Sequence, residues 1–339
     1  MGLDMPALPL IDRYTQENKS PHVVILGAGA SRASFLNGDK HGRRVPLMND
    51  LIDTVGLGPI LQAAGLDFRE RNFEHIYDEV HSLGKKHLID ELQQRVYSYF
   101  GKMQITEAPT IYDLLLLSLR PKDLVATFNW DPFLAQAFKR NRRLRLLPGI
   151  VFLHGCVSIG ICETCYVKGF IEDCCQKCGK PFAPTQLLYP VRQKGYSEDL
   201  FISDEWKRLR NKLQYAYFLT IFGYSAPKTD VEAIDLLKGA WTKNKTAELA
   251  QIEIIDIADR KLLESNWEDF FVRNHYSVDP DFWTSWLCRY PRRTCEALSS
   301  ATLMMKPMLP NQIPHEESLS ALQEWFYPLI IEEENVAWT

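Results

Sequence analysis

Long hydrophobic runs are missing from this sequence. Its longest apolar stretches, residues 114–117 and the broken run 213–222, fall well short of the ~20 residues that a membrane-spanning helix needs. The N-terminus also lacks the charged-then-apolar order of a secretory signal peptide. We therefore expect a cytoplasmic protein with no membrane partner. Its eight cysteines are then expected to be metal ligands and reduced buried thiols, not disulfides.

A large excess of one charge is missing as well. The formal net charge of −4 over 339 residues gives no electrostatic sign of direct nucleic-acid binding. There is no internal repeat and no low-complexity tract. With 46% apolar and 24% charged residues, the composition is that of an ordinary globular protein, long enough for one large domain with insertions or for two domains.

What the sequence does contain is two Cys-x-x-Cys pairs close together, Cys162/Cys165 and Cys175/Cys178. Each pair places two thiolates on one tight turn, and two such turns supply the four-sulfur shell that zinc prefers. The spacing therefore predicts a structural zinc site. The alternative is four unpaired cysteines in the core.

The remaining cysteines are less informative. Cys174 adjoins Cys175 and could compete with it as a ligand, although the regular spacing favours Cys175. We interpret Cys156, Cys288 and Cys295 as core residues, because cysteine without ligand spacing behaves as a small buried apolar side chain.

Five short apolar runs indicate strands of a parallel sheet covered on both faces, because they lack polar alternation. They are residues 22–26, 123–128, 150–153, 214–222 and 252–255. Each stops at a polar or glycine-bearing turn, as expected if a ligand lies across the carboxyl ends of the strands.

The first of these turns is Gly27-Ala28-Gly29-Ala30-Ser31. A strand, a glycine turn and a helix form the order in which helix amides meet a phosphate, and we expect the phosphate to approach too closely for a side chain at Gly29. By itself the turn could also be an ordinary tight turn, because the usual dinucleotide fingerprint has a third glycine that is absent here.

Outside the strands the pattern is mostly helical, with apolar residues at helical spacing. The sequence predicts an α/β fold with a Rossmann-like parallel sheet, a helical insertion, a small zinc ribbon and a helical C-terminal segment. The expected division is an N-terminal arm (1–20), a main domain (21–260) with its insertion at about 45–119 and its ribbon at about 157–184, and the C-terminal segment (261–339).

Taken in chain order, several motifs resemble the sirtuin superfamily over roughly residues 22–260. They are the glycine turn, Thr127-Phe-Asn-Trp-Asp131, His154-Gly155, the cysteine pairs and Gly223-Tyr-Ser225. The resemblance implies a Rossmann-like sheet that binds NAD, with the phosphates at the glycine turn and the zinc ribbon outside the active site.

The resemblance also implies roles for single residues. Asn129 would meet the nicotinamide ribose, Asp131 the carboxamide, and His154 would act as a general base. Ser225 and Asp256 would hold the adenosine half. The other expected contacts to NAD are Gly27, Ala28, Gly29, Ala30, Ser31, Thr127 and Gly223.

The chemistry of NAD cleavage calls for such side chains. Nicotinamide leaves through a cationic transition state, so the site must orient the ring and deprotonate the incoming water or hydroxyl, for which an imidazole is suited near neutral pH. An amide holds a ribose hydroxyl without adding charge, and a carboxylate accepts a bond from the carboxamide. In the alternative interpretation, Asn129 and Asp131 form a helix-capping turn and His154 is a structural histidine.

The chain departs from the deacylases of this superfamily. Their Ile-Pro-Asp-Phe-Arg run after the glycine turn is replaced by Leu36-Asn-Gly-Asp-Lys40. Their Gln-Asn-Ile-Asp motif appears here as Phe128-Asn-Trp-Asp131, so an aromatic residue replaces one polar side chain of the site. Where they pair with an acylated peptide, this chain has Leu188-Tyr-Pro190, and a proline removes a backbone donor. Peptide docking by strand addition therefore loses expected parts.

The long insertion and the added C-terminal helices resemble sirtuin-like domains of prokaryotic anti-phage defence systems, which hydrolyse NAD. We therefore expect an NAD⁺ hydrolase, oligomeric and with a possible partner ATPase or other defence protein. The alternatives are an NAD-dependent deacylase or ADP-ribosyltransferase, and a catalytically silent sensor of NAD or ADP-ribose.

Overall fold

The computed structural model describes residues 18–190, 195–226, 230–271, 275–315 and 318–336. At its centre lies a parallel sheet of six strands in the order β3-β2-β1-β7-β8-β9. This is the doubly wound order, in which the sheet grows first to one side of β1 and then to the other. The strands are β1 (His22–Leu26), β2 (Leu124–Thr127), β3 (Gly149–Phe152), β7 (Phe218–Phe222), β8 (Gln251–Ile255) and β9 (His275–Asp279).

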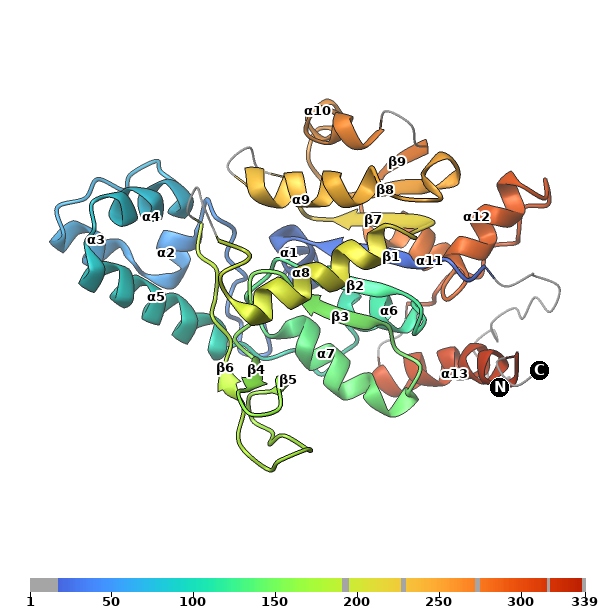
Figure 1. The fold of residues 1–339 in the computed structure, drawn as a ribbon, viewed down its shortest axis with the longest axis horizontal. Helices are drawn as coiled ribbons and strands as arrows, with labels where there is room; N and C mark the ends of the chain where they lie inside the picture. The colour runs from blue at the N-terminus through green and yellow to red at the C-terminus, as the bar shows by residue number, and fades with distance from the viewer. Residues whose placement is uncertain (1–17, 191–194, 227–229, 272–274, 316–317, 337–339) are drawn as a thin grey trace, which may run out of the picture.

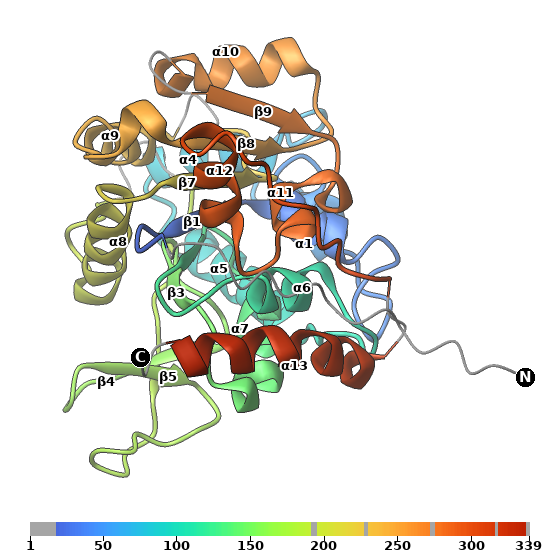
Figure 2. The same ribbon diagram turned by 90° about the vertical axis from the view of Figure 1, so that its right-hand side faces the viewer.

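Helices cover both faces of this sheet. On one face α8 (Leu200–Leu213) packs against α9 (Val231–Trp241), and on the other α6 (Ile111–Leu117) contacts α1 (Ala28–Ser34) and α11 (Trp286–Arg289) (Figure 2). Every residue of β1 and β7 is consequently buried. The two-sided cover is the physical reason why these strands carry continuous apolar runs.

The helical insertion forms a lobe beside the edge of the sheet where the strands end, here named the carboxyl edge (Figure 1). In α4 one face buries Phe73, Ile76, Tyr77 and Val80, as their helical spacing predicts. The prediction of a helical insertion is confirmed. Its helices are α2 (Leu51–Val55), α3 (Gly58–Ala63), α4 (Phe73–Ser82) and α5 (Lys86–Gly101), followed by α6.

A second, smaller sheet is antiparallel, with the order β5-β4-β6. It carries the cysteine pairs. Its strands are β4 (Ile159–Cys162), β5 (Val167–Phe170) and β6 (Ala183–Pro184). The other elements are α7 (Phe133–Asn141), α10 (Arg260–Phe271), α12 (Thr294–Thr302), α13 (Leu319–Val336) and the 3₁₀ turns η1 (Arg142–Leu144), η2 (Ala247–Leu249) and η3 (Phe282–Thr284).

The C-terminal helices pack onto the main domain. Buried residues of the sheet, the insertion and α13 belong to one continuous hydrophobic cluster. The buried guanidinium of Arg292 donates to the carbonyl of Leu119 at 2.8 Å and to Glu333 of α13 at 2.6 Å. None of the helices in the described segments is long and apolar enough to span a membrane.

The structure differs from the sequence-based expectation in two elements. Strand β9 was not predicted, because its residues are partly exposed and not an apolar run; it is stabilised by parallel pairing with β8. The fourth predicted strand, 214–222, begins only at Phe218, because residues 214–217 form the turn that connects the end of α8 to the sheet. Of the predicted N-terminal arm, residues 1–17 lie outside the described residues.

Candidate active site and metal cluster

The glycine turn lies where the order of the parallel sheet reverses. Its strand β1 is paired with β7, so Gly27 and Gly223 follow neighbouring strand ends. The amide of Gly27 donates to the carbonyl of Phe222 at 2.9 Å, and that of Gly29 to Gly223 at 3.0 Å. Two strand ends are thereby joined at the position where doubly wound folds bind their ligands.

The glycines of this turn are required by close contact between backbones. A Cβ added to Gly29 would lie 2.7 Å from the Cα of Gly223, and one added to Gly223 would lie 2.2 Å from the amide nitrogen of Ala30. Gly223 also has a φ of +61°, which favours glycine. Contact with the backbone of Gly223 is thus sufficient by itself to require glycine at position 29.

The amides of the turn are largely engaged inside the protein. Those of Gly27 and Gly29 donate to β7 and its turn, and that of Ala30 donates to the carbonyl of Gly27 at 3.0 Å. Ala28 is half-buried at the start of α1. A phosphate at this turn would therefore compete with existing hydrogen bonds.

Asn129 connects the end of β2 to this turn. Its side-chain nitrogen donates to the carbonyl of Gly27 at 2.8 Å and lies 2.9 Å from Ser31 Oγ and 3.2 Å from the hydroxyl of Tyr112. Its backbone amide donates to Thr127 Oγ1 at 3.0 Å. Because all of these residues are buried, removing the side-chain amide of Asn129 would take one donor away from the carbonyl of Gly27 and from the hydroxyls of Ser31 and Tyr112.

Asp131 belongs to the same buried group. One carboxylate oxygen accepts a bond from Ser31 Oγ at 2.6 Å, and the other accepts from the amide of Phe133 at 3.2 Å. Burial raises the pKa of Asp131 to about 6, although the bonds from Ser31 and Phe133 lower it. The bond to Phe133 closes an Asx turn immediately before α7, whose N-cap is Pro132.

His154 follows β3 and lies among aromatic rings. Its Nε2 is 2.7 Å from the hydroxyl of Tyr196, and its ring meets Phe128, the neighbour of Asn129, edge to face at 4.8 Å. Phe128 in turn stacks on Tyr224 at 4.2 Å. His154 and Asn129 are each only 8% exposed, so both expected catalytic groups are buried near the carboxyl edge.

The two residues expected at the adenosine half also lie at the carboxyl edge, one after β7 and one after β8. Ser225 is exposed, and its carbonyl accepts a bond from Asn266 at 2.9 Å. Asp256 is half-buried and accepts from the amide of Ala258 at 2.9 Å. Both residues therefore lie at the same end of the sheet as the glycine turn.

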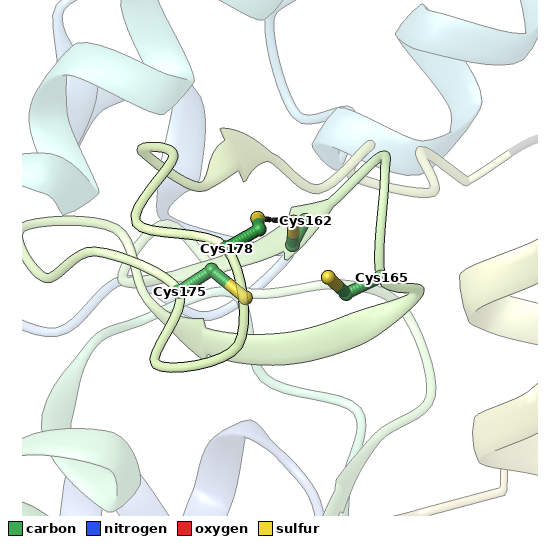
Figure 3. Close-up of side chains that lie close together, drawn as sticks. All are labelled: Cys162, Cys165, Cys175 and Cys178. Atoms are coloured by element: carbon green, nitrogen blue, oxygen red, sulfur yellow. Dashed lines mark hydrogen bonds between the residues drawn. The ribbon is translucent and has the colours of Figure 1, made fainter.

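The four cysteines come together as their spacing predicts. The sulfurs of Cys162, Cys165, Cys175 and Cys178 all lie within 4.8 Å of one another (Figure 3), and those of Cys162 and Cys178 are 3.4 Å apart. A tetrahedron with Zn–S bonds of about 2.3 Å separates its sulfurs by about 3.8 Å. The cluster therefore fits a structural zinc ion.

Cys174 does not join this cluster. It is exposed, and its backbone pairs with Pro181 in an isolated bridge. The backbone turn that buries Cys175 directs the neighbouring side chain away, which decides between the two candidate ligands. Of the other cysteines, Cys156, Cys288 and Cys295 are buried, as predicted.

An ion pair between a half-buried lysine and a buried glutamate attaches the ribbon to the main sheet. Lys168 of β5 donates to both oxygens of Glu205 in α8 at 2.8 and 2.7 Å, and to the carbonyl of Ile150 in β3 at 2.7 Å. Glu205 also accepts the amide of Phe152 at 2.8 Å. Because β3 is an edge strand, this carboxylate satisfies a donor that no further strand covers.

Sequence reasoning missed four residues that surround the expected site. They are Tyr112, Tyr196, Tyr224 and Asp230. Tyr112 lies within the Thr110-x-x-Asp113 capping box and Asp230 precedes α9, but these signals indicate helix starts only. Their side chains reach the site because α6, α8 and α9 begin at the carboxyl edge and Tyr224 follows β7 there, an arrangement that no local motif encodes.

No protein-family model and no curated protein matches this sequence. Among solved structures, the chain is similar to a Sir2 homologue in complex with NAD, at 14% identity and a TM-score of 0.40, over 84% of this chain and 90% of that one. It is also similar to a mutant Sir2 homologue with ADP-ribose (13%, TM-score 0.42, 84% and 92%) and to Sir2 bound to an acetylated peptide (12%, TM-score 0.39, 84% and 93%). The fold assignment rests on this chain's own strand order and cysteine cluster.

Proposed function

We propose that this protein is a sirtuin-like NAD⁺ hydrolase that releases nicotinamide and ADP-ribose. The observation that carries the proposal is the grouping of Asn129, Asp131 and His154 next to the joined ends of β1 and β7. A doubly wound sheet offers its ligand site at this point. The resemblance of the motif order to the sirtuin superfamily supports NAD as this ligand.

Each of these side chains has a chemical task in the proposed reaction. His154 removes a proton from the attacking water, as an imidazole can near neutral pH. Asn129 orients a ribose hydroxyl, and Asp131 receives the carboxamide of nicotinamide. Asn129 and Asp131 must exchange some of their bonds to Ser31 and Tyr112 for bonds to the substrate, so binding is expected to rearrange this buried group.

Hydrolysis is favoured over deacylation by the segment where deacylases pair with their peptide. The amide of Leu188 donates to the carbonyl of His154 at 3.0 Å, and the carbonyl of Leu188 accepts from Trp130 Nε1 at 3.2 Å. Pro190 has no amide hydrogen. Backbone groups that would extend a sheet with a substrate peptide are thus engaged or missing.

We further propose that the protein acts in anti-phage defence by depleting NAD, as an oligomer or with a partner ATPase or other defence protein. The burial of His154 and Asn129 supports a resting state that needs activation. A constitutively open hydrolase would consume the NAD of its own cell.

Product analysis after incubation with NAD⁺ tests the proposal. We expect ADP-ribose and nicotinamide in equal amounts, and a loss of turnover of about 100- to 10,000-fold in His154→Ala, the usual cost of removing a general base. Exposed His81 provides the matched control, and His81→Ala should retain activity. O-acyl-ADP-ribose formed with an acylated peptide would indicate a deacylase instead, and binding without any product would indicate a sensor.

A further inference from the structure

A chain of hydrogen bonds leads from His154 to the carboxylate of Asp230. Nε2 of His154 is 2.7 Å from the hydroxyl of Tyr196, which lies 3.1 Å from one oxygen of Asp230. The other oxygen of Asp230 accepts from the hydroxyl of Tyr224 at 2.9 Å. All four side chains are buried, so these bonds are shielded from competition by water.

The number of protons available determines which group donates in each of these hydrogen bonds. Burial, reinforced by Asp230, raises the pKa of Tyr196 and of Tyr224 far above the ordinary value. Each tyrosine therefore keeps its single proton, and both donate it to the carboxylate of Asp230. The oxygen of Tyr196 is then left as an acceptor, which requires the proton of His154 to sit on Nε2.

We propose that Tyr196 and Asp230 are positioning residues for His154: they hold its proton on Nε2, make Nδ1 the basic nitrogen, and stabilise the imidazolium that forms when His154 takes a proton. The arrangement resembles a nucleophile's base oriented by a carboxylate, with a tyrosine hydroxyl inserted between the two groups. The catalytic part of this inference rests on the proposed hydrolase function.

The charges around the chain agree with this role. Within the part of the chain that the structure describes, the carboxylates that act on the two tyrosines besides Asp230 are Glu232 of α9, which raises the pKa of Tyr196, and Glu74 of α4, which raises that of Tyr224. These carboxylates add negative potential. Phe128 and Trp206 fill the space beside the rings. A buried positive charge on His154 is stabilised by such surroundings.

The same contact admits an opposite interpretation, in which the Tyr196 hydroxyl blocks the base in a resting state. The two interpretations predict opposite effects of Tyr196→Phe. A positioning hydroxyl, when removed, lowers turnover, whereas a blocking hydroxyl, when removed, raises it.

The first test is a pH profile of NAD hydrolysis by the full-length Tyr196→Phe and Asp230→Asn variants. We expect kcat to fall by a factor of at least about ten. The loss should be smaller than the ~10⁴-fold loss caused by removing the orienting carboxylate of a catalytic triad. KM should change less than about threefold. Because the imidazolium loses its partner, the pKa of His154 falls, and the acid limb of the profile moves to lower pH. Tyr215→Phe, at an exposed tyrosine near the end of α8, should match the wild type in both respects.

The second test does not need turnover. In ¹⁵N-histidine-labelled protein, NMR titration should show His154 with its proton on Nε2 and a lower pKa in Tyr196→Phe than in the wild type. If the NMR result is as expected but the protein does not cleave NAD, the proposed hydrolase function is wrong and the positioning of His154 by Tyr196 is still supported. A proton on Nδ1, an unshifted pKa, or faster turnover of Tyr196→Phe would overturn the inference.

Discussion

At the scale of single residues, the interior of the sheet holds a buried polar chain apart from the site. His22 of β1 is 2.8 Å from Thr220 of β7, which donates to Glu253 of β8 at 2.9 Å. Glu253 also accepts the amide of Trp286 at 2.7 Å. Burial lowers the pKa of His22 to about 3 and raises that of Glu253 to about 7, so both groups are neutral in mildly acidic solution.

Replacing Glu253 by glutamine should change how stability depends on pH. The folded protein keeps the proton on Glu253 up to about pH 7, whereas the unfolded chain releases it near 4.5. Between these values the folded state binds more protons, so the wild type loses stability as pH rises. Glutamine mimics the protonated acid, and Glu253→Gln should gain on the order of 3 kcal/mol relative to the wild type between pH 4.5 and 8.

Thermal melting of both proteins across this pH range measures the effect. His22 has a lowered pKa, so its contribution makes the folded protein more stable as pH rises. Because both proteins contain His22, this contribution cancels when their melting temperatures are compared. Glu248→Gln, at an exposed position, should leave the pH dependence unchanged. A melting temperature of Glu253→Gln that follows the wild type at every pH would show that Glu253 is ionised in the fold.

At the scale of elements, the ribbon has too little apolar interior to be stable alone. Its strand β5 is only half-buried, and β6 contains two residues. What organises it is the cysteine cluster on one side and the pair Lys168–Glu205 on the other. A structural zinc ion contributes folding free energy directly in such small elements.

The cysteine cluster leads to a prediction with a built-in control. Freshly purified protein should contain about one zinc per chain, and Cys175→Ser should lose the zinc and lower the melting temperature. Cys174→Ser removes the adjacent, exposed thiol and should retain both. Elemental analysis and thermal melting decide the matter. Wild-type protein without zinc, or loss of zinc in Cys174→Ser only, would contradict the ligand assignment.

At the scale of the whole molecule, the proposed active site is enclosed by parts from distant regions of the sequence. The insertion contributes Tyr77, which stacks on Tyr189 at 5.0 Å, and Tyr189 contacts Trp130 at 4.9 Å. Movement of the insertion lobe would therefore shift Trp130 and the neighbouring Asn129 through these ring contacts. This packing gives assembly a physical route to the site, because packed interiors transmit small shifts.

We accordingly expect NAD hydrolysis to depend on assembly. The isolated protomer should turn over slowly because its expected catalytic groups are buried, and the rate per protomer should rise with protein concentration or on addition of a partner. Hydrolysis measured from nanomolar to micromolar protein, alongside the oligomeric state by light scattering, tests this. Full activity of a monomer at nanomolar concentration, with no dependence on concentration, would refute it.

Local patterns in the sequence determined the strands that are fully covered and the cysteine cluster. Buried strands such as β1 must be apolar on both faces, and metal ligands must sit at fixed spacing, so both leave a signature that needs no knowledge of the fold. The positions of Asn129, Asp131 and His154 after strand ends followed from the same signals.

Only the tertiary structure decided the rest. Strand β9 is partly exposed and has no continuous apolar run, so its sequence does not predict a strand; its pairing with β8 stabilises it. Positions 29 and 223 require glycine because the backbones of the two turns, which follow neighbouring strands, are in close contact. Tyr196 and Asp230 reach His154 from separate segments of the chain, because contacts between residues far apart in sequence depend on how the elements pack, and no local pattern records that packing.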